Sequence, residues 1–239
     1  SGSIKTALII GSETLSRFVN WKDRNTCILF GDGAGAFVLQ ASERPGGVLS
    51  AVMHSDGSGG DLLTLPGGGS RYPITETTFH EGKHYIQMDG KEVFRFATRV
   101  MASATQEALD AAGLKMEDIR WVVPHQANVR IIEAAARGLK LPMDRFIVNL
   151  DRYGNTSTAS IPIAMVEAIE KGQIKSGDKF VMVGFGAGLT WGALAAEWTG
   201  PMPSKGQVHP EQYRRLGRLR SWVRRFIRFM EGLLYRREL

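Results

Sequence analysis

Two polar side chains in short motifs, His125 and Asn155, have the types needed to stabilise a negatively charged oxygen. They lie 30 residues apart, in Pro-His-Gln-Ala-Asn over residues 124–128 and Gly-Asn-Thr-Ser-Thr-Ala-Ser over residues 154–160. A neutral imidazole and a carboxamide can together donate two hydrogen bonds to one carbonyl oxygen, and so stabilise an enolate without a full charge. The alternative is that His125 caps a helix and Asn155 forms a turn.

The elements around the two motifs favour a shared site. Each motif follows an apolar run, residues 121–123 in one case and 146–148 in the other. Each polar residue is therefore expected where a strand ends and a helix begins. In open α/β sheets, ligands bind at that edge. We therefore expect His125 and Asn155 to contribute to one site.

The hydrophobic pattern predicts an α/β protein with layered elements. Residues 91–112 have helical spacing with Gly113 as a C-terminal cap, and further helices are expected over residues 128–138 and 157–171. The predicted strands cover residues 4–11, 46–53, 120–123, 146–150, 179–184 and 189–198, and a glycine turn at residues 31–35 precedes another strand. Helices and strands alternate from residue 91 to 198, which is typical of α/β layering.

The chain contains an internal echo. Residues 5–11 resemble residues 179–184, and residues 31–36 resemble residues 184–189, so a strand with a Gly-rich turn occurs twice. We expect a duplicated α/β unit whose second half is complete and whose first half is truncated. The predicted parts are residues 1–83, residues 84–200, and residues 201–239 as a linker followed by a basic helix.

The net charge of +6 is concentrated at one end of the chain. Residues 201–239 hold ten Lys and Arg and three Asp and Glu, a net charge of +7, which leaves −1 for the first 200 residues. The charge of the globular part therefore needs no anionic partner to explain it, and we expect no nucleic acid. The single cysteine favours a reducing compartment, so we expect the cytoplasm or a plastid-like stroma. The spacing of His54, His80 and His84 predicts no metal site.

Four motifs, taken in order, resemble those of the type III β-ketoacyl-acyl-carrier-protein synthases. They occupy residues 31–36 (GDGAGA), 124–128 (PHQAN), 154–157 (GNTS) and 184–191 (GFGAGLTW), and the resemblance runs from about Ser1 to Trp198. It implies a thiolase-like, layered αβαβα fold, a homodimer, no permanently bound cofactor, and acyl-CoA and malonyl-acyl carrier protein as substrates. Plant-type polyketide synthases share the fold but do not usually carry the His-Gln-Ala-Asn run.

The resemblance implies a decarboxylative condensation that initiates fatty acid synthesis. His125 and Asn155 match the family's decarboxylation pair, which would hold a thioester carbonyl as it becomes an enolate. Phe185 matches a residue beside the malonyl carboxylate, residues 186–188 match a turn that supplies backbone donors, and Arg130 matches a carrier-protein contact. Substrate-binding positions are matched by Met88, Gly90, Phe94, Ala127, Asn128, Phe185, Gly186 and Ala187. Core packing is the alternative for Met88 and Phe94, and a solvated surface charge for Arg130.

The nucleophile is where the chain departs from the family pattern. The family's cysteine lies upstream of the position that matches Ser1, and the only cysteine here is Cys27 in the apolar run of residues 27–30. A cysteine in such a run is usually an inert small hydrophobe. We therefore expect the chain to hold half of the mechanism, as a truncated piece or as one subunit of a split enzyme that receives its N-terminal half in trans.

Residues 211–237 are predicted to form a basic amphipathic helix after a linker over residues 199–210. Its apolar stripe comprises Leu216, Leu219, Trp222, Val223, Phe226, Ile227, Met230, Leu233 and Leu234, and its cationic side carries Arg214, Arg215, Arg218, Arg220, Arg224, Arg225 and Arg228. Three interpretations remain open: binding to an anionic membrane surface, docking onto a protein such as acyl carrier protein, or packing on the chain's own globular part.

Two other functions remain open for the whole chain. The first is a condensing enzyme that makes a polyketide starter or another acyl product. Such an enzyme would differ from one that initiates fatty acid synthesis in the size of its acyl pocket. The second is a non-catalytic scaffold that works through the basic tail and retains a vestigial site. The intact His125 and Asn155 pair argues against the scaffold.

Overall fold

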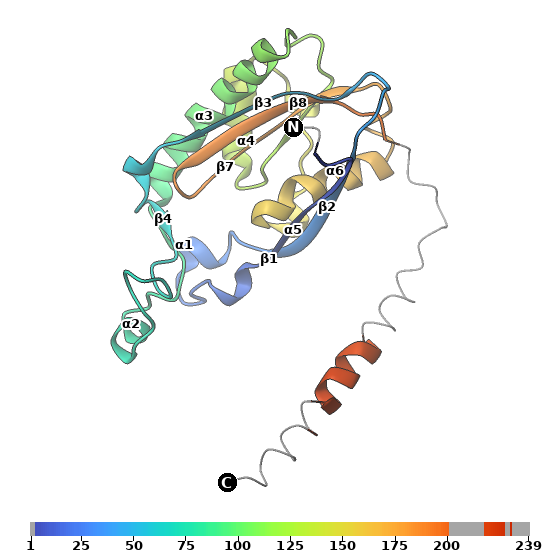
Figure 1. Cartoon of the computed structure of the whole chain (residues 1–239). Coiled ribbons are helices and arrows are strands. Elements are labelled where there is room, and N and C mark those ends of the chain that lie inside the picture. The colour runs from blue at the N-terminus through green and yellow to red at the C-terminus, as the bar shows by residue number, and fades with distance from the viewer. Residues whose placement is uncertain (1–2, 201–217, 228–229, 231–239) are drawn as a thin grey trace. The chain divides into compact units, whose positions relative to one another are not determined.

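The computed structural model describes residues 3–200, 218–227 and 230 (Figure 1). The chain divides into two units, residues 1–202 and 203–239, and each is described by itself. The strands of the first unit are β1 (Thr6–Thr14), β2 (Asp32–Gln40), β3 (Gly47–Ser55), β4 (Leu63–Thr64), β5 (Gln87–Met88), β6 (Trp121–Pro124), β7 (Lys179–Gly186) and β8 (Thr190–Glu197). Its helices are α1 (Arg24–Cys27), α2 (Glu76–His80), α3 (Gly90–Ala111), α4 (Val129–Leu139), α5 (Leu150–Tyr153) and α6 (Ser160–Glu170), with 3₁₀ turns η1 (Leu15–Arg17), η2 (Gly57–Gly59), η3 (Met143–Arg145) and η4 (Ser157–Ala159).

A four-stranded sheet in the order β3-β8-β7-β6 forms the centre of the first unit. Strands β6 and β7 are parallel, and the other pairs are antiparallel. Successive side chains point to opposite faces of a strand, so Val122 and Val123 of β6 enter two different cores. The sheet is therefore covered on both faces, as the layered α/β prediction required.

Helices α3 and α4 cover one face of the sheet (Figure 1). The N-terminus of α3 is capped by the carboxylate of Asp89, which accepts hydrogen bonds from the backbone N–H groups of Lys91 and Glu92. The helix ends at Ala111, and Gly113 forms the predicted C-terminal cap with a left-handed φ of +65°. There the N–H groups of Gly113 and Leu114 reach back to the carbonyls of residues 110 and 109, which is a Schellman motif.

Helix α6 covers the other face and separates the sheet from the two-stranded ribbon β1–β2 (Figure 1). The predicted glycine turn at residues 31–35 is wrong, because Gly33 and Gly35 lie within strand β2. These two glycines allow helix α6 to lie close to the strand. A Cβ on Gly35 would lie 2.6 Å from Cβ of Pro162, and one on Gly33 would lie 2.9 Å from Cδ1 of Ile163. The glycines thus let α6 pack directly on the ribbon.

The predicted strand over residues 146–150 is also wrong. Phe146 forms only an isolated bridge with Val122, and the chain turns into α5 at Leu150. The side chain of Gln126 takes the place of a strand partner, because its amide donates to the carbonyl of Ile147 and its Oε1 accepts the N–H of Asn149. These two bonds satisfy the backbone groups that a ladder would otherwise pair.

The other predicted elements are present with shifted ends. Strand β1 covers residues 6–14 rather than 4–11, and the helix predicted over residues 157–171 begins with the 3₁₀ turn η4 before α6. The division of the first unit near residue 83 stays a prediction.

The second unit contains a helix over residues 218–227, within the range predicted for the tail. The remainder of that prediction, residues 201–217, 228–229 and 231–239, lies outside the described residues. No helix in the described ranges is both long and apolar enough to cross a membrane.

The close packing of β2 on α6 makes a stability prediction. We expect Gly35→Ala to destabilise the chain by about 1–3 kcal/mol, because the added methyl group overlaps Pro162 and one layer must shift. Gly57→Ala is the matched control, since a Cβ there meets nothing within 4 Å. Urea unfolding of both variants measures the difference, and equal midpoints for the two would contradict this account of the ribbon.

Candidate active site

A large open pocket of about 1540 Å³ lies in the first unit, where both predicted motifs meet. It is lined by segments that are far apart in the sequence, including α1, the start of α3, the end of β6, the turn around Asn155 and the β7–β8 turn. The lining exposes more apolar than polar surface. A pocket of this kind, with a few convergent polar groups, is where a ligand site is expected.

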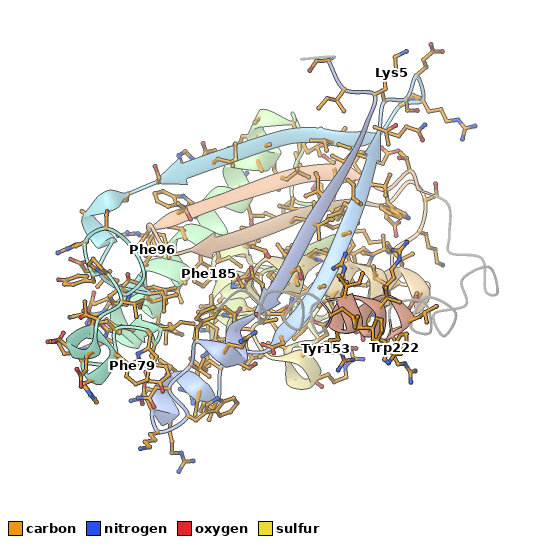
Figure 2. All side chains as sticks on the ribbon, turned by 60° about the horizontal axis from the view of Figure 1, so that its bottom comes forward. Lys5, Phe79, Phe96, Tyr153, Phe185 and Trp222 are labelled. Carbon is orange, nitrogen blue, oxygen red and sulfur yellow. The ribbon has the colours of Figure 1, made fainter. Side chains whose placement is uncertain are left out.

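His125 is held at the end of β6 by the sheet itself. Its backbone N–H donates to the carbonyl of Val183 at 2.8 Å, which extends the parallel pairing of β6 with β7 by one residue. Its ring packs edge-on against Phe185, with 5.5 Å between the ring centroids. Phe185 in turn contacts Phe96, and both lie near one end of the sheet (Figure 2). The imidazole is therefore fixed by the sheet on one side and by an aromatic cluster on the other.

Ser160 orients the imidazole of His125. Its Oγ lies 2.7 Å from Nδ1 of the ring and 3.4 Å from the backbone nitrogen of Gln126. A hydroxyl has one hydrogen and two lone pairs, so Oγ can accept from Gln126 N–H and donate its hydrogen to Nδ1 at the same time. This arrangement favours the tautomer with its proton on Nε2, so His125 can donate a hydrogen bond into the pocket.

The protonation state of His125 follows from its surroundings. The residue is only partly exposed, and burial lowers its pKa to about 4. An imidazole buried among apolar groups loses the hydration that would stabilise its cation. His125 is therefore neutral near pH 7 and acts as a hydrogen-bond donor without a charge.

Asn155 is oriented by a different set of bonds. Its backbone forms a parallel bridge with Phe30, in which its N–H donates to Leu29 and its carbonyl accepts from Gly31, at 2.8 and 2.9 Å. The side-chain Oδ1 accepts the N–H of Ser157 at 2.9 Å. With Oδ1 occupied, the Nδ2 amide is the part of the carboxamide that can donate to a ligand. The expectation that Asn155 follows a strand is wrong, because it follows helix α5.

The buried carboxamide of Gln126 links the two motifs, and the sequence analysis missed it. Gln126 is 1% exposed and bonds the carbonyls of Pro124 and Ile147 and the N–H of Asn149. Beyond it, Asn149 and Arg152 donate to Glu167 of α6. This chain of bonds connects the His125 turn to the segment that leads into Asn155. The signal that could have identified Gln126 was its position between His125 and Ala127 in the predicted motif.

The pocket lining contains the residues predicted to be catalytic or to bind substrate. Its lining includes His125, Asn155, Met88, Gly90, Phe94, Ala127, Asn128, Phe185, Gly186 and Ala187. Asn128 also caps α4, since its Oδ1 accepts the N–H of Arg130 at 2.9 Å. Arg130 itself is exposed and is not among the lining residues described.

Other lining residues were not predicted. They include Ser160, the cations Arg24 and Lys91, and the carboxylates Asp61 and Asp89. Cys27 is the last residue of α1 and half-buried, but it is not among the described residues that line the pocket. Within the described ranges, no group of three or more His, Cys, Asp or Glu side chains could hold a metal ion.

Comparisons with known proteins give a consistent result over both parts of the first unit. The 3-oxoacyl-[acyl-carrier-protein] synthase III model matches residues 1–57, and the model of the C-terminal part of that enzyme matches residues 109–198. The β-ketoacyl-[acyl-carrier-protein] synthases III of Roseiflexus castenholzii and Desulfitobacterium hafniense are 50% and 53% identical over 199 residues, which is 83% of this chain and 60% of each relative.

A solved structure agrees with the sequence matches. The Thermus thermophilus β-ketoacyl-[acyl carrier protein] synthase III superposes with a TM-score of 0.75 at 46% identity, over 84% of this chain and 61% of that one. The layered arrangement is thus the thiolase-type α/β fold, and the chain spans about 60% of the length of the curated relatives it matches. On these matches, the chain belongs to the 3-oxoacyl-[acyl-carrier-protein] synthase III family.

Proposed function

We propose that this chain carries the decarboxylating half of an acyltransferase that condenses an acyl-CoA primer with a malonyl thioester on acyl carrier protein, as the first step of fatty acid synthesis. One observation carries the proposal. Ser160 bonds Nδ1 of His125 and the N–H of Ser157 bonds Oδ1 of Asn155, which leaves Nε2–H and Nδ2–H as neutral donors that face one pocket. Two preorganised donors at one oxygen are the arrangement that stabilises an oxyanion.

The proposed decarboxylation uses these donors directly. The thioester carbonyl oxygen accepts hydrogen bonds from Nε2–H of His125 and Nδ2–H of Asn155. The bond to the carboxylate breaks, carbon dioxide leaves, and its electron pair moves onto the α-carbon to give an enolate whose negative charge rests on that oxygen. The apolar ring of Phe185 lies against His125 and disfavours a charged carboxylate nearby, which favours its loss as a neutral molecule.

Carbon–carbon bond formation needs an acyl group on a nucleophile. The enolate carbon attacks the acyl thioester carbonyl, the new bond forms, and the thiolate of the nucleophile leaves. Cys27 is the only cysteine in the sequence, and it is not among the residues that line the pocket. We therefore propose that the reactive thiol is contributed by another polypeptide segment. The ribbon β1–β2 offers a surface for such a segment, because Leu8, Ile10 and Val38 on one of its faces are 62%, 63% and 69% exposed.

The proposed partners follow from the same site. We propose that the substrate arm enters along Met88, Phe94 and Ala127, and that Arg130 in the first turn of α4 contacts the acidic carrier protein. A homodimer and a cytoplasmic location belong to this proposal as well. No permanently bound cofactor or metal is required, because the proposed chemistry is carried by hydrogen-bond donors and a thiol.

The first prediction from the proposed function concerns the two donors. We expect His125→Ala and Asn155→Ala each to lower the decarboxylation of a malonyl thioester of acyl carrier protein by about 10²–10³-fold, since each removes one donor from the developing oxyanion. Carbon dioxide release by the chain measures this. His80→Ala is the matched control, because His80 is exposed and outside the pocket lining, and it should keep the wild-type rate. Unchanged rates in both site variants would rule out the proposed role.

The second prediction concerns the charge of His125. Its folded pKa of about 4 lies below the 6.5 of an unperturbed imidazole, so the unfolded chain binds this proton first as pH falls. The free energy of unfolding is therefore unaffected by this titration above pH 6.5 and falls as the pH decreases from 6.5 to 4, where the unfolded chain binds the proton and the folded chain does not. We expect wild type to lose about 2 kcal/mol relative to His125→Gln between pH 7.5 and 4.5. Urea unfolding at several pH values tests this, and parallel curves for the two proteins would contradict a depressed pKa.

The third prediction concerns the nucleophile. Incubation with radiolabelled acetyl-CoA should leave no label on Cys27, because this thiol does not line the pocket. Cys27→Ser is the control for any background signal. If the label appears on wild type and disappears in Cys27→Ser, the proposed division of the reaction between two segments is wrong.

A further inference from the structure

The helix over residues 218–227 separates its apolar and cationic side chains onto two sides. At 100° per residue, the apolar side chains occupy an arc of about 140°. They are Leu219, Trp222, Val223, Phe226 and Ile227. The rest of the circumference is occupied by Ser221 and by four arginines, Arg218, Arg220, Arg224 and Arg225. Arg218 and Arg220 flank the apolar arc on its two borders.

Within the second unit, no described residue covers the apolar side of this helix. Leu219, Trp222 and Phe226 are 58%, 60% and 51% exposed, and Trp222 projects from the helix as a labelled side chain (Figure 2). The rings of Trp222 and Phe226 stack on each other at 5.8 Å between centroids, which makes one continuous aromatic surface. Water contact of this much apolar surface is unfavourable, so a ligand that covers it is expected.

The positive charge of residues 201–239 indicates that the ligand is negatively charged. No Asp or Glu occurs between Glu211 and Glu231, and residues 201–239 carry a net charge of +7. The ligand must therefore offer a negatively charged surface and an apolar phase next to each other. A duplex nucleic acid offers phosphates without an apolar phase, and a second copy of this helix would bring the same cations together.

A lipid bilayer with anionic head groups meets both requirements. Trp and Phe side chains bury their rings at the boundary between head groups and acyl chains, and arginines on the borders of the arc extend their guanidinium groups back to the phosphates. We propose that the helix over residues 218–227 binds the surface of an anionic membrane and lies parallel to it. This inference does not depend on the proposed catalytic function.

Co-sedimentation of the full chain with vesicles tests the proposal. We expect binding to vesicles of phosphatidylcholine with phosphatidylglycerol, and little binding to vesicles of phosphatidylcholine alone. Replacing the four arginines at positions 218, 220, 224 and 225 by Gln should weaken the partition by at least about a hundredfold at low salt. The matched control removes four exposed cations from the first unit, at Lys22, Arg44, Lys115 and Lys175, and should bind like wild type.

Tryptophan fluorescence supplies a second measurement that does not depend on charge variants. With anionic vesicles, wild type should show a blue shift that is absent from Trp222→Phe, because Trp222 enters the apolar phase.

Three outcomes overturn the proposal. The first is equal binding to both kinds of vesicle, and the second is equal binding by the four-arginine variant and its control. The third is a chain that ignores vesicles but forms dimers or binds duplex DNA, with either property lost in the four-arginine variant. Decarboxylation of the malonyl thioester in the absence of vesicles is measured in the same variants, so a failure of the membrane proposal is distinguished from a failure of the catalytic one.

Discussion

The buried side chain of Gln126 is the interaction on which the geometry of the site depends. It lies directly after His125 and bonds backbone groups on both sides of a gap that no strand fills, the carbonyls of Pro124 and Ile147 and the N–H of Asn149. A buried carboxamide with all of these partners is rigid, because breaking any one bond leaves a polar group without water. The turn that carries His125 and the segment that leads toward Asn155 are therefore held in a fixed relation.

The close approach of helix α6 explains why glycines recur along β2. Helix α6 supplies Ser160 to the imidazole and Glu167 to the Asn149 and Arg152 bonds, and it also packs on strand β2 of the ribbon. Gly33 and Gly35 remove the side chains that would keep it away. The packing of a ribbon and a helix thus determines where a hydroxyl group meets a catalytic candidate.

The sequence predicted the elements with strong periodicity and missed those built from single polar contacts. Helix α3 and strand β7 follow from apolar spacing, and the Gly113 cap follows from its position after that spacing. Residues 146–150 carry the apolar composition of a strand, yet a side chain rather than a strand satisfies their backbone, and periodicity contains no information on that. For the site, residue types identified His125 and Asn155. Ser160 could not be identified, because its role depends on α6 bringing it to Nδ1, a contact between residues 35 positions apart.

The neutral state of the candidate pair and the apolar character of its pocket are two consequences of one cause. Burial beside Phe185 removes the hydration that an imidazolium would need, which lowers the pKa of His125 to about 4. The same low polarity strengthens a hydrogen bond from an uncharged donor to a developing oxyanion. A cation at this position would hold the substrate carboxylate as tightly as the enolate and would not favour the loss of carbon dioxide. The hydrogen bond from a neutral donor becomes stronger only as negative charge moves onto the carbonyl oxygen. The apolar pocket that lowers the pKa of His125 therefore also strengthens the hydrogen bond from its Nε2–H to the enolate oxygen.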